Sequence, residues 1–103
     1  MIPDLSYQFT TKVWAYFNGK STYYLASIPA KTGSAIRAMQ EGKPRRGWGS
    51  VPVVITIGGS RWKSSIFPES GTKSYLFLLN AKARKAESIV ENSRISVCIT
   101  LRD

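Results

Sequence analysis

The chain of 103 residues contains no histidine and a single cysteine, Cys98. Histidine is the usual general base near neutral pH and the commonest protein ligand of metal ions. A zinc site needs several sulfur or imidazole ligands, which one cysteine does not supply. The sequence therefore predicts no metal centre and no cofactor, and it disfavours catalysis that depends on an imidazole.

One cysteine also excludes a disulfide within the chain. Cys98 lies in the middle of an expected strand, so we interpret it as a structural residue, and its free thiol is typical of a reducing cytoplasm. Residues 1–7 contain neither the basic nor the apolar segment of a signal peptide. No apolar run approaches the ~20 residues that span a membrane. We expect a cytoplasmic protein that has no contact with membranes.

Acidic residues are scarce. Six Asp and Glu residues stand against fifteen Lys and Arg residues, which gives a net charge of +9. None of the acids forms a spaced pair on an expected strand, so a hydrolase that uses two carboxylates is disfavoured. A positive surface attracts nucleic acid, acidic lipid headgroups and phosphorylated ligands. Alternatively, the charge only keeps the protein soluble.

The pattern of apolar residues predicts one all-β domain over residues 1–103. Alternating apolar and polar residues predict strands, and Gly, Pro and Asn separate them. We expect six strands (7–17, 22–28, 51–57, 61–67, 74–79 and 94–101) and two short helices (31–40 and 81–87). Residues 74–79 are apolar on both faces, which predicts a central, buried strand. Short strands in this number indicate a small β-barrel or a β-sandwich.

Local signals define the ends of these elements. Residues 18–20 (NGK) and 58–59 (GG) are typical of hairpin turns. We expect Thr32 or Ser34 to cap the first helix, Gly42 to end it and Asn80 to cap the second helix. The apolar face of the first helix is expected to consist of Ala35, Ile36 and Met39.

Basic residues that alternate with aromatic residues give the best indication of a function. If Trp62 faces the core, its neighbours Arg61 and Lys63 both face outward, because strand neighbours alternate. A basic face beside an exposed ring is typical of sites for single strands or nucleotides. The candidate residues for binding an anion are Arg45, Arg46, Trp48, Arg61 and Lys63. The alternative is that these long side chains only cover the outside of a barrel.

The sequence leaves the question of enzymatic activity open and favours a binding protein. The partner that we expect is nucleic acid or another polyanion, bound by a monomer or a weak homo-oligomer. A small-molecule or hydrolytic site at the mouth of the barrel is the first alternative, because Ser64 and Ser65 follow Lys63. A serine next to a lysine is weak evidence for a nucleophile. A module for protein interaction is the second alternative.

Several segments, in order, resemble the domain-of-unknown-function family 1905. They are residues 46–53 (RGWGSVPV), 62–68 (WKSSIFP), 75–79 (YLFLL) and 84–86 (RKA). The resemblance covers about residues 7–101. It departs from the family at 77–79, where members often have proline, and at 92–93, where they often have Gly-Asp.

The resemblance implies a double-split β-barrel that short helices cap. AbrB-type regulators and MazE-type antitoxins share this fold, build it from two short chains and bind DNA. A chain of the present length would complete the barrel alone. The family has no established activity and no agreed catalytic residues, so the resemblance implies a fold and leaves DNA binding as an analogy at the level of the fold.

Overall fold

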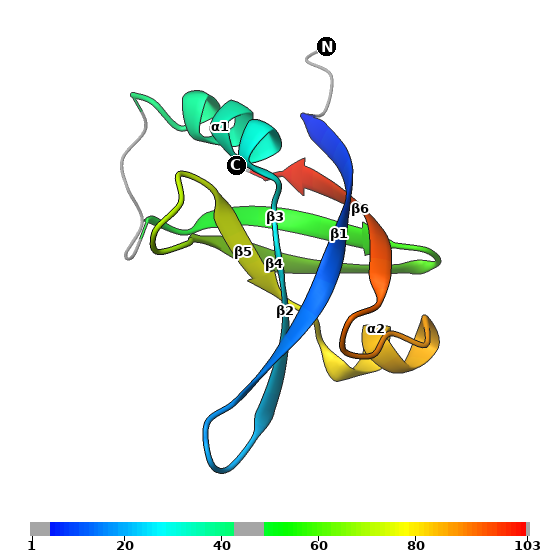
Figure 1. Cartoon of the computed structure of the whole chain (residues 1–103). Coiled ribbons are helices and arrows are strands. Elements are labelled where there is room, and N and C mark those ends of the chain that lie inside the picture. The colour runs from blue at the N-terminus through cyan, green and yellow to red at the C-terminus, as the bar shows by residue number, and fades with distance from the viewer. Residues whose placement is uncertain (1–4, 43–48, 103) are drawn as a thin grey trace.

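The computed structural model describes residues 5–42 and 49–102, which form a closed antiparallel barrel of six strands with two short helices (Figure 1). The strands are β1 (Ser6–Phe17), β2 (Thr22–Ser27), β3 (Val51–Ile57), β4 (Ser60–Pro68), β5 (Tyr75–Leu78) and β6 (Arg94–Leu101). The helices are α1 (Ala30–Met39) and α2 (Ala81–Ala86). The predicted fold class, a small all-β barrel with two short helices, is confirmed.

The barrel consists of two sheets that share the long strands β1 and β4. The first half of β1 pairs with β6, and its second half pairs with β2. Likewise, β4 pairs with β3 over most of its length and with β5 at its end. The change in β1 falls between Lys12, opposite Arg94, and Val13, opposite Ala26. The outward side chains of β1 therefore pass without a break from the first sheet (β1-β6-β3-β4) to the second (β1-β2-β5-β4).

The order of the strands relates the two halves of the chain by an approximate two-fold axis. The first half runs β1-β2-α1-β3, the second runs β4-β5-α2-β6, and the strand order β1-β2-β5-β4-β3-β6 is unchanged when the halves are exchanged. Corresponding hydrogen bonds agree: the amide of Ile28 donates to the carbonyl of Tyr75, and that of Leu79 donates to Tyr24, both at 2.8 Å. Neither half closes a barrel alone.

The core is the inside of the barrel. Alternate side chains of each strand face inward, which is why every second residue of β3 is buried. Removing such a side chain from water stabilises the fold by roughly 1.5–3 kcal/mol each. The largest fully buried side chains are Phe77, Ile28, Ile36, Ile55, Ile66 and Ile99.

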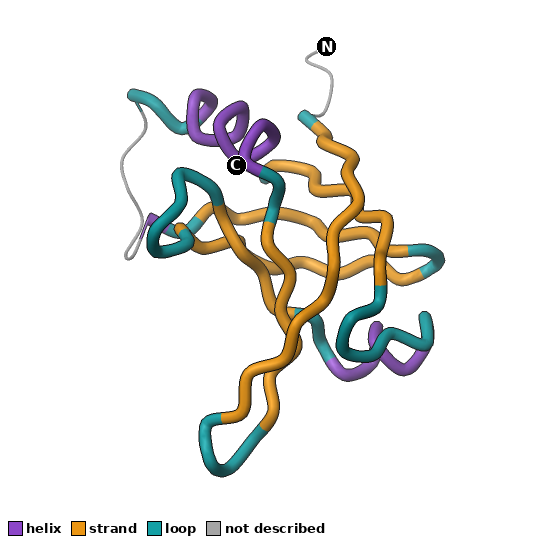
Figure 2. The backbone as a smooth tube through the Cα atoms, in the orientation of Figure 1, coloured by secondary structure: helices purple, strands orange, loops and turns teal. Residues whose placement is uncertain are grey.

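The ends of the barrel are covered by the two helices, as the tube in Figure 2 shows. Asn80 caps α2 as predicted, because its side-chain oxygen accepts a hydrogen bond from the Ala83 amide at 2.7 Å. The expected cap of α1 by Thr32 or Ser34 is wrong. This helix begins directly after Pro29, which has φ −54° and makes no side-chain cap. The chain turns into the helix at the end of β2, so the first turn forms before either hydroxyl is reached.

The contact surface of α1 is narrower than predicted. Only Gly33 and Ile36 are buried, whereas Ala35 and Met39 are exposed. The helix lies across the barrel end and touches it along one line of residues three apart. At the end of α1, Gln40 is the cap residue, and Gly42 adopts a positive φ of 81° two residues later.

The expectation that β5 is buried on both faces is also wrong. Tyr75 and Phe77 face the core, whereas Leu78 is 41% exposed. In a closed barrel without a covering layer, only one face of each strand is buried. Leu76 and Leu78, on the other face of β5, point to the outside of the barrel. No helix among the described residues has the length and apolar character needed to cross a membrane.

Candidate anion-binding face

The outer side of the first sheet carries a shallow hollow of about 420 Å³. It extends over β1, β6 and β3, where Gln8, Cys98 and Thr56 lie opposite one another in neighbouring strands. The residues that line it are Gln8, Phe9, Thr10, Thr56, Gly58, Ser96, Val97 and Cys98. Most of them carry hydroxyl, amide or thiol groups, so the hollow offers hydrogen-bond donors to an oxygen-rich ligand.

Two cations meet at the edge of this hollow. Lys12 of β1 and Arg94 of β6 lie directly opposite each other, and both are exposed. The guanidinium of Arg94 also donates to the hydroxyl of Thr10, which lines the hollow, at 3.4 Å. Like charges directly opposite in a sheet are destabilising. An anion bound between Lys12 and Arg94 would remove that repulsion.

Two further cations lie on β4. Trp62 packs against the core, and Arg61 and Lys63 on either side of it are exposed, which is the orientation expected from the sequence. Arg61 lies opposite Thr56, so its side chain starts next to the hollow, and Lys63 lies opposite Val54. We call the hollow together with Lys12, Arg61, Lys63 and Arg94 the basic face.

Carboxylates are missing from every described strand and helix, none of which contains Asp or Glu. The described acids lie in loops, and two of them accept hydrogen bonds from serines. Glu69 accepts from Ser27 and Glu87 from Ser60, both at 2.9 Å. Glu87 also lies against Gly58, so it borders the hollow at the β3–β4 turn. Within residues 5–42 and 49–102, no cation of the basic face forms an ion pair.

Arg45, Arg46 and Trp48, the other candidate residues, lie outside the described residues. Arg84 of α2 stacks on the ring of Tyr24, with its guanidinium carbon 4.0 Å from the ring centre, so its charge faces the protein. That contact is a cation–π interaction, which stabilises by about 0.5–2 kcal/mol.

The serines of the hydrolytic alternative do not line the hollow. Ser64 faces inward with Trp62, while Ser65 faces outward with Lys63, so the two hydroxyls point to opposite sides of β4. In the described part, the Ser64 hydroxyl donates its only side-chain hydrogen bond to the Ser65 carbonyl, at 3.5 Å. Among the described residues, no group of three His, Cys, Asp or Glu side chains is placed to hold a metal ion.

Sequence reasoning missed Lys12, Arg94 and the polar residues of the hollow. Their strands were predicted correctly, and alternation places them on the outward faces. What the sequence does not show is that β1, β6 and β3 are neighbours, because strands from the two ends of the chain come together only when the barrel closes. The order of the strands and their register, not a local motif, create the basic face.

The fold and the face define a class of protein: a small closed β-barrel whose outer surface carries a polar hollow with exposed cations near its edges. The family described as Domain of unknown function (DUF1905) matches residues 9–99, and the chain belongs to this family. The resemblance in the sequence is thus confirmed. A comparison with curated proteins finds no match.

Proposed function

We propose that the basic face binds nucleic acid through its phosphate groups. The observation that carries this proposal is the placement of four cations, none in an ion pair with a described carboxylate, on the same outer face as a hollow lined by hydroxyl and amide groups. Phosphate contacts in protein–nucleic acid complexes come from these same groups, lysine, arginine, hydroxyls and amides. The net charge of +9 draws a polyanion toward the protein from a distance.

Three residues that precede β3 in the sequence remain candidates for the proposed site. Arg45 and Arg46 precede β3 in the sequence, and Trp48 between two glycines is a ring on which a base can stack. These three residues rest on the sequence pattern alone. The proposal places the protein in the cytoplasm, which the free thiol of Cys98 supports.

The proposal predicts binding that weakens steeply as salt is raised. Each neutralised phosphate contributes a slope of about −0.9 to the plot of log affinity against log salt for duplex DNA, and about −0.7 for single strands. The measurement is fluorescence anisotropy of labelled oligonucleotides at low salt, repeated at increasing salt. Binding to neither DNA nor RNA at low salt would refute the proposed function.

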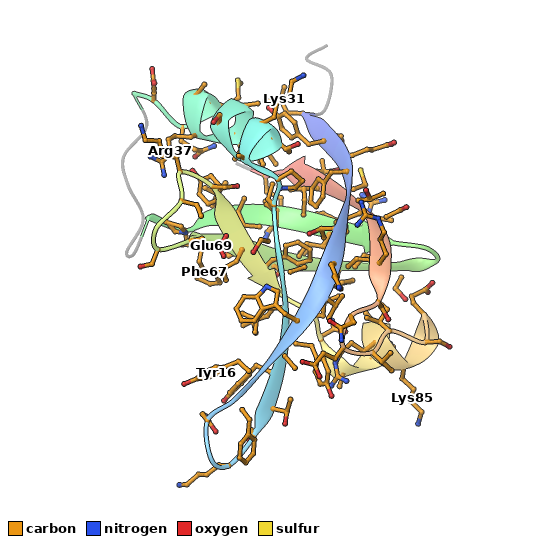
Figure 3. The ribbon with its side chains drawn as sticks, in the orientation of Figure 1. Tyr16, Lys31, Arg37, Phe67, Glu69 and Lys85 are labelled. Atoms are coloured by element: carbon orange, nitrogen blue, oxygen red, sulfur yellow. The ribbon has the colours of Figure 1, made fainter. Side chains whose placement is uncertain are left out.

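A matched pair of double variants tests the site. The change Arg61→Gln with Lys63→Gln removes two cations of the basic face, and we expect weaker binding and a salt slope shallower by up to about two phosphates. The control is Lys73→Gln with Lys85→Gln, which removes the same charge elsewhere. Lys73 lies in the loop at the far end of β4, and Figure 3 shows Lys85 pointing away from the barrel. Equal losses in both variants would mean that net charge, and not this face, drives binding.

A further inference from the structure

The second sheet carries an exposed apolar surface on its outer side. Trp14 is 37% exposed, Tyr16 55%, Tyr23 42% and Leu78 41%. Tyr16 lies directly opposite Tyr23, and Trp14 lies opposite Leu25, which in turn is opposite Leu78. We call these five residues the aromatic face. Its side chains do not contribute to the core, so the stability of the barrel does not explain why they are aromatic.

The aromatic face continues the basic face along a single strand. The outward residues of β1 are, in order, Gln8, Thr10, Lys12, Trp14 and Tyr16. The first two line the hollow, and Lys12 stands beside Arg94. The eight steps from Gln8 to Tyr16 span roughly 27 Å at about 3.4 Å per residue. Phosphate-binding groups are thus followed directly by exposed rings.

The charges around the aromatic face favour an anionic occupant. Lys12 stands at one end of it, and Lys20 in the exposed β1–β2 turn stands at the other. Two described carboxylates lie near this surface in the chain: Glu69 accepts a hydrogen bond from Ser27, and Glu91 precedes Asn92, whose amide donates to the Val13 carbonyl. Figure 3 shows Glu69 beside Phe67, away from the β1–β2 turn and on the same side of the molecule as Tyr16. An anionic chain on this surface would therefore run along β1 and β2 and would not extend toward β4.

Building on the proposed function, we propose that the protein binds single-stranded nucleic acid, with bases stacked on Trp14 and Tyr16 and phosphates held by Lys12 and Arg94. Every base has a π-face, and stacking on exposed aromatic rings beside a basic groove is how single strands are bound without sequence preference. In a duplex these π-faces are covered by neighbouring base pairs. A second copy of the chain is a poorer occupant, because it would bring another charge of +9 to the same surface.

The experiment measures anisotropy with three ligands of equal length: oligo-dT, a duplex, and a chain of abasic nucleotides that has phosphates but no bases. We expect Trp14→Leu or Tyr16→Leu to lower the affinity for oligo-dT at least about fivefold. We expect affinity for the duplex and the abasic chain to stay unchanged, because those ligands offer no accessible base. Circular dichroism spectra that match the spectrum of the original chain check that the variants are folded.

The control variant is Phe17→Leu. Phe17 is 65% exposed and adjoins Tyr16, but it belongs to the opposite side of β1, which carries Val13 and Ala15. The Phe17→Leu variant should leave all three affinities unchanged.

The proposal that bases stack on the aromatic face is refuted if Trp14→Leu and Tyr16→Leu leave the affinity for oligo-dT unchanged. In that case, a lower affinity of the Arg61→Gln, Lys63→Gln double variant would still support the proposed function. If none of the three ligands binds at low salt, both proposals fail. A dimer in sedimentation equilibrium that Trp14→Leu dissociates would instead assign the aromatic face to a second copy and overturn the inference.

Discussion

Replacing Gly33 by alanine should destabilise the protein, although the change improves helix propensity. Gly33 lies in α1, where alanine is favoured over glycine by about 1 kcal/mol. The structure opposes this gain, because α1 crosses the barrel end with Gly33 directly on Ser74. A Cβ atom at residue 33 would lie 2.6 Å from the Ser74 Cβ and 2.8 Å from its Cα, and closer still to its hydroxyl. Contacts below 3.0 Å with backbone force one element to move.

The cost has two parts. Overpacking in a closed core costs about 1–3 kcal/mol. Ser74 is 2% exposed and its hydroxyl donates to the Ile28 carbonyl at 2.6 Å, so displacing it removes a buried hydrogen bond, a loss of about 0.5–1.5 kcal/mol. After the gain in propensity of about 1 kcal/mol, we expect a net loss of about 0.5–3.5 kcal/mol. In a domain of about 100 residues this lowers Tm by roughly 2–28 °C.

Urea unfolding followed by circular dichroism measures this loss, and two further variants test its cause. Ser34→Ala, at the adjacent exposed residue, makes the same kind of gain in propensity and should be neutral or slightly stabilising. Ser74→Gly should destabilise the original chain. It should destabilise the Gly33→Ala variant less, because it removes most of the clash between residues 33 and 74. If Gly33→Ala proves as stable as the original chain, α1 does not pack on Ser74 as described.

Two further predictions test the exposure of single residues. Phe77→Ala should lower the free energy of unfolding in urea by about 3–5 kcal/mol, whereas Leu78→Ser should lower it by under about 1 kcal/mol, because only one face of β5 is buried. Similar losses in the two variants would contradict the exposure of Leu78 to solvent. Alkylation of Cys98, the half-buried single thiol in the hollow, by iodoacetate should weaken binding of nucleic acid more than iodoacetamide does, because it adds a negative charge. Equal effects of the two reagents on anisotropy would place the phosphates away from the hollow.

The sequence predicts most of the elements, because each depends on local signals. Every second residue of 51–57 is apolar and glycines follow, and the structure has a strand over Val51–Ile57 with Gly58 at φ 57°. The errors concern tertiary contacts. Residues 74–79 have the composition of a strand buried on both faces, but whether a second layer covers the outer face is not encoded locally.

The site was less accessible to prediction than the fold. The outward orientation of Arg61 and Lys63 follows from alternation around Trp62, and this part of the prediction is confirmed. The pairing of Lys12 with Arg94 joins two strands from opposite ends of the chain and is fixed only by register. Whether the candidate residues bind an anion stays a prediction. A periodic pattern identifies the face of a strand on which a cation lies, but not the strand beside it.

The placement of charges distinguishes solubility from binding better than their number does. Cations that only keep a protein soluble work from any exposed position, and repulsion favours spacing them apart. In this barrel, Lys12 and Arg94 lie directly opposite each other, at a cost of a few tenths of a kcal/mol or more. No described strand contains an acidic residue that could offset this repulsion. Glu69 and Glu87 lie in loops, where they accept hydrogen bonds from Ser27 and Ser60. An anion bound between Lys12 and Arg94 would relieve this repulsion, and this is the physical reason for proposing that the basic face binds one.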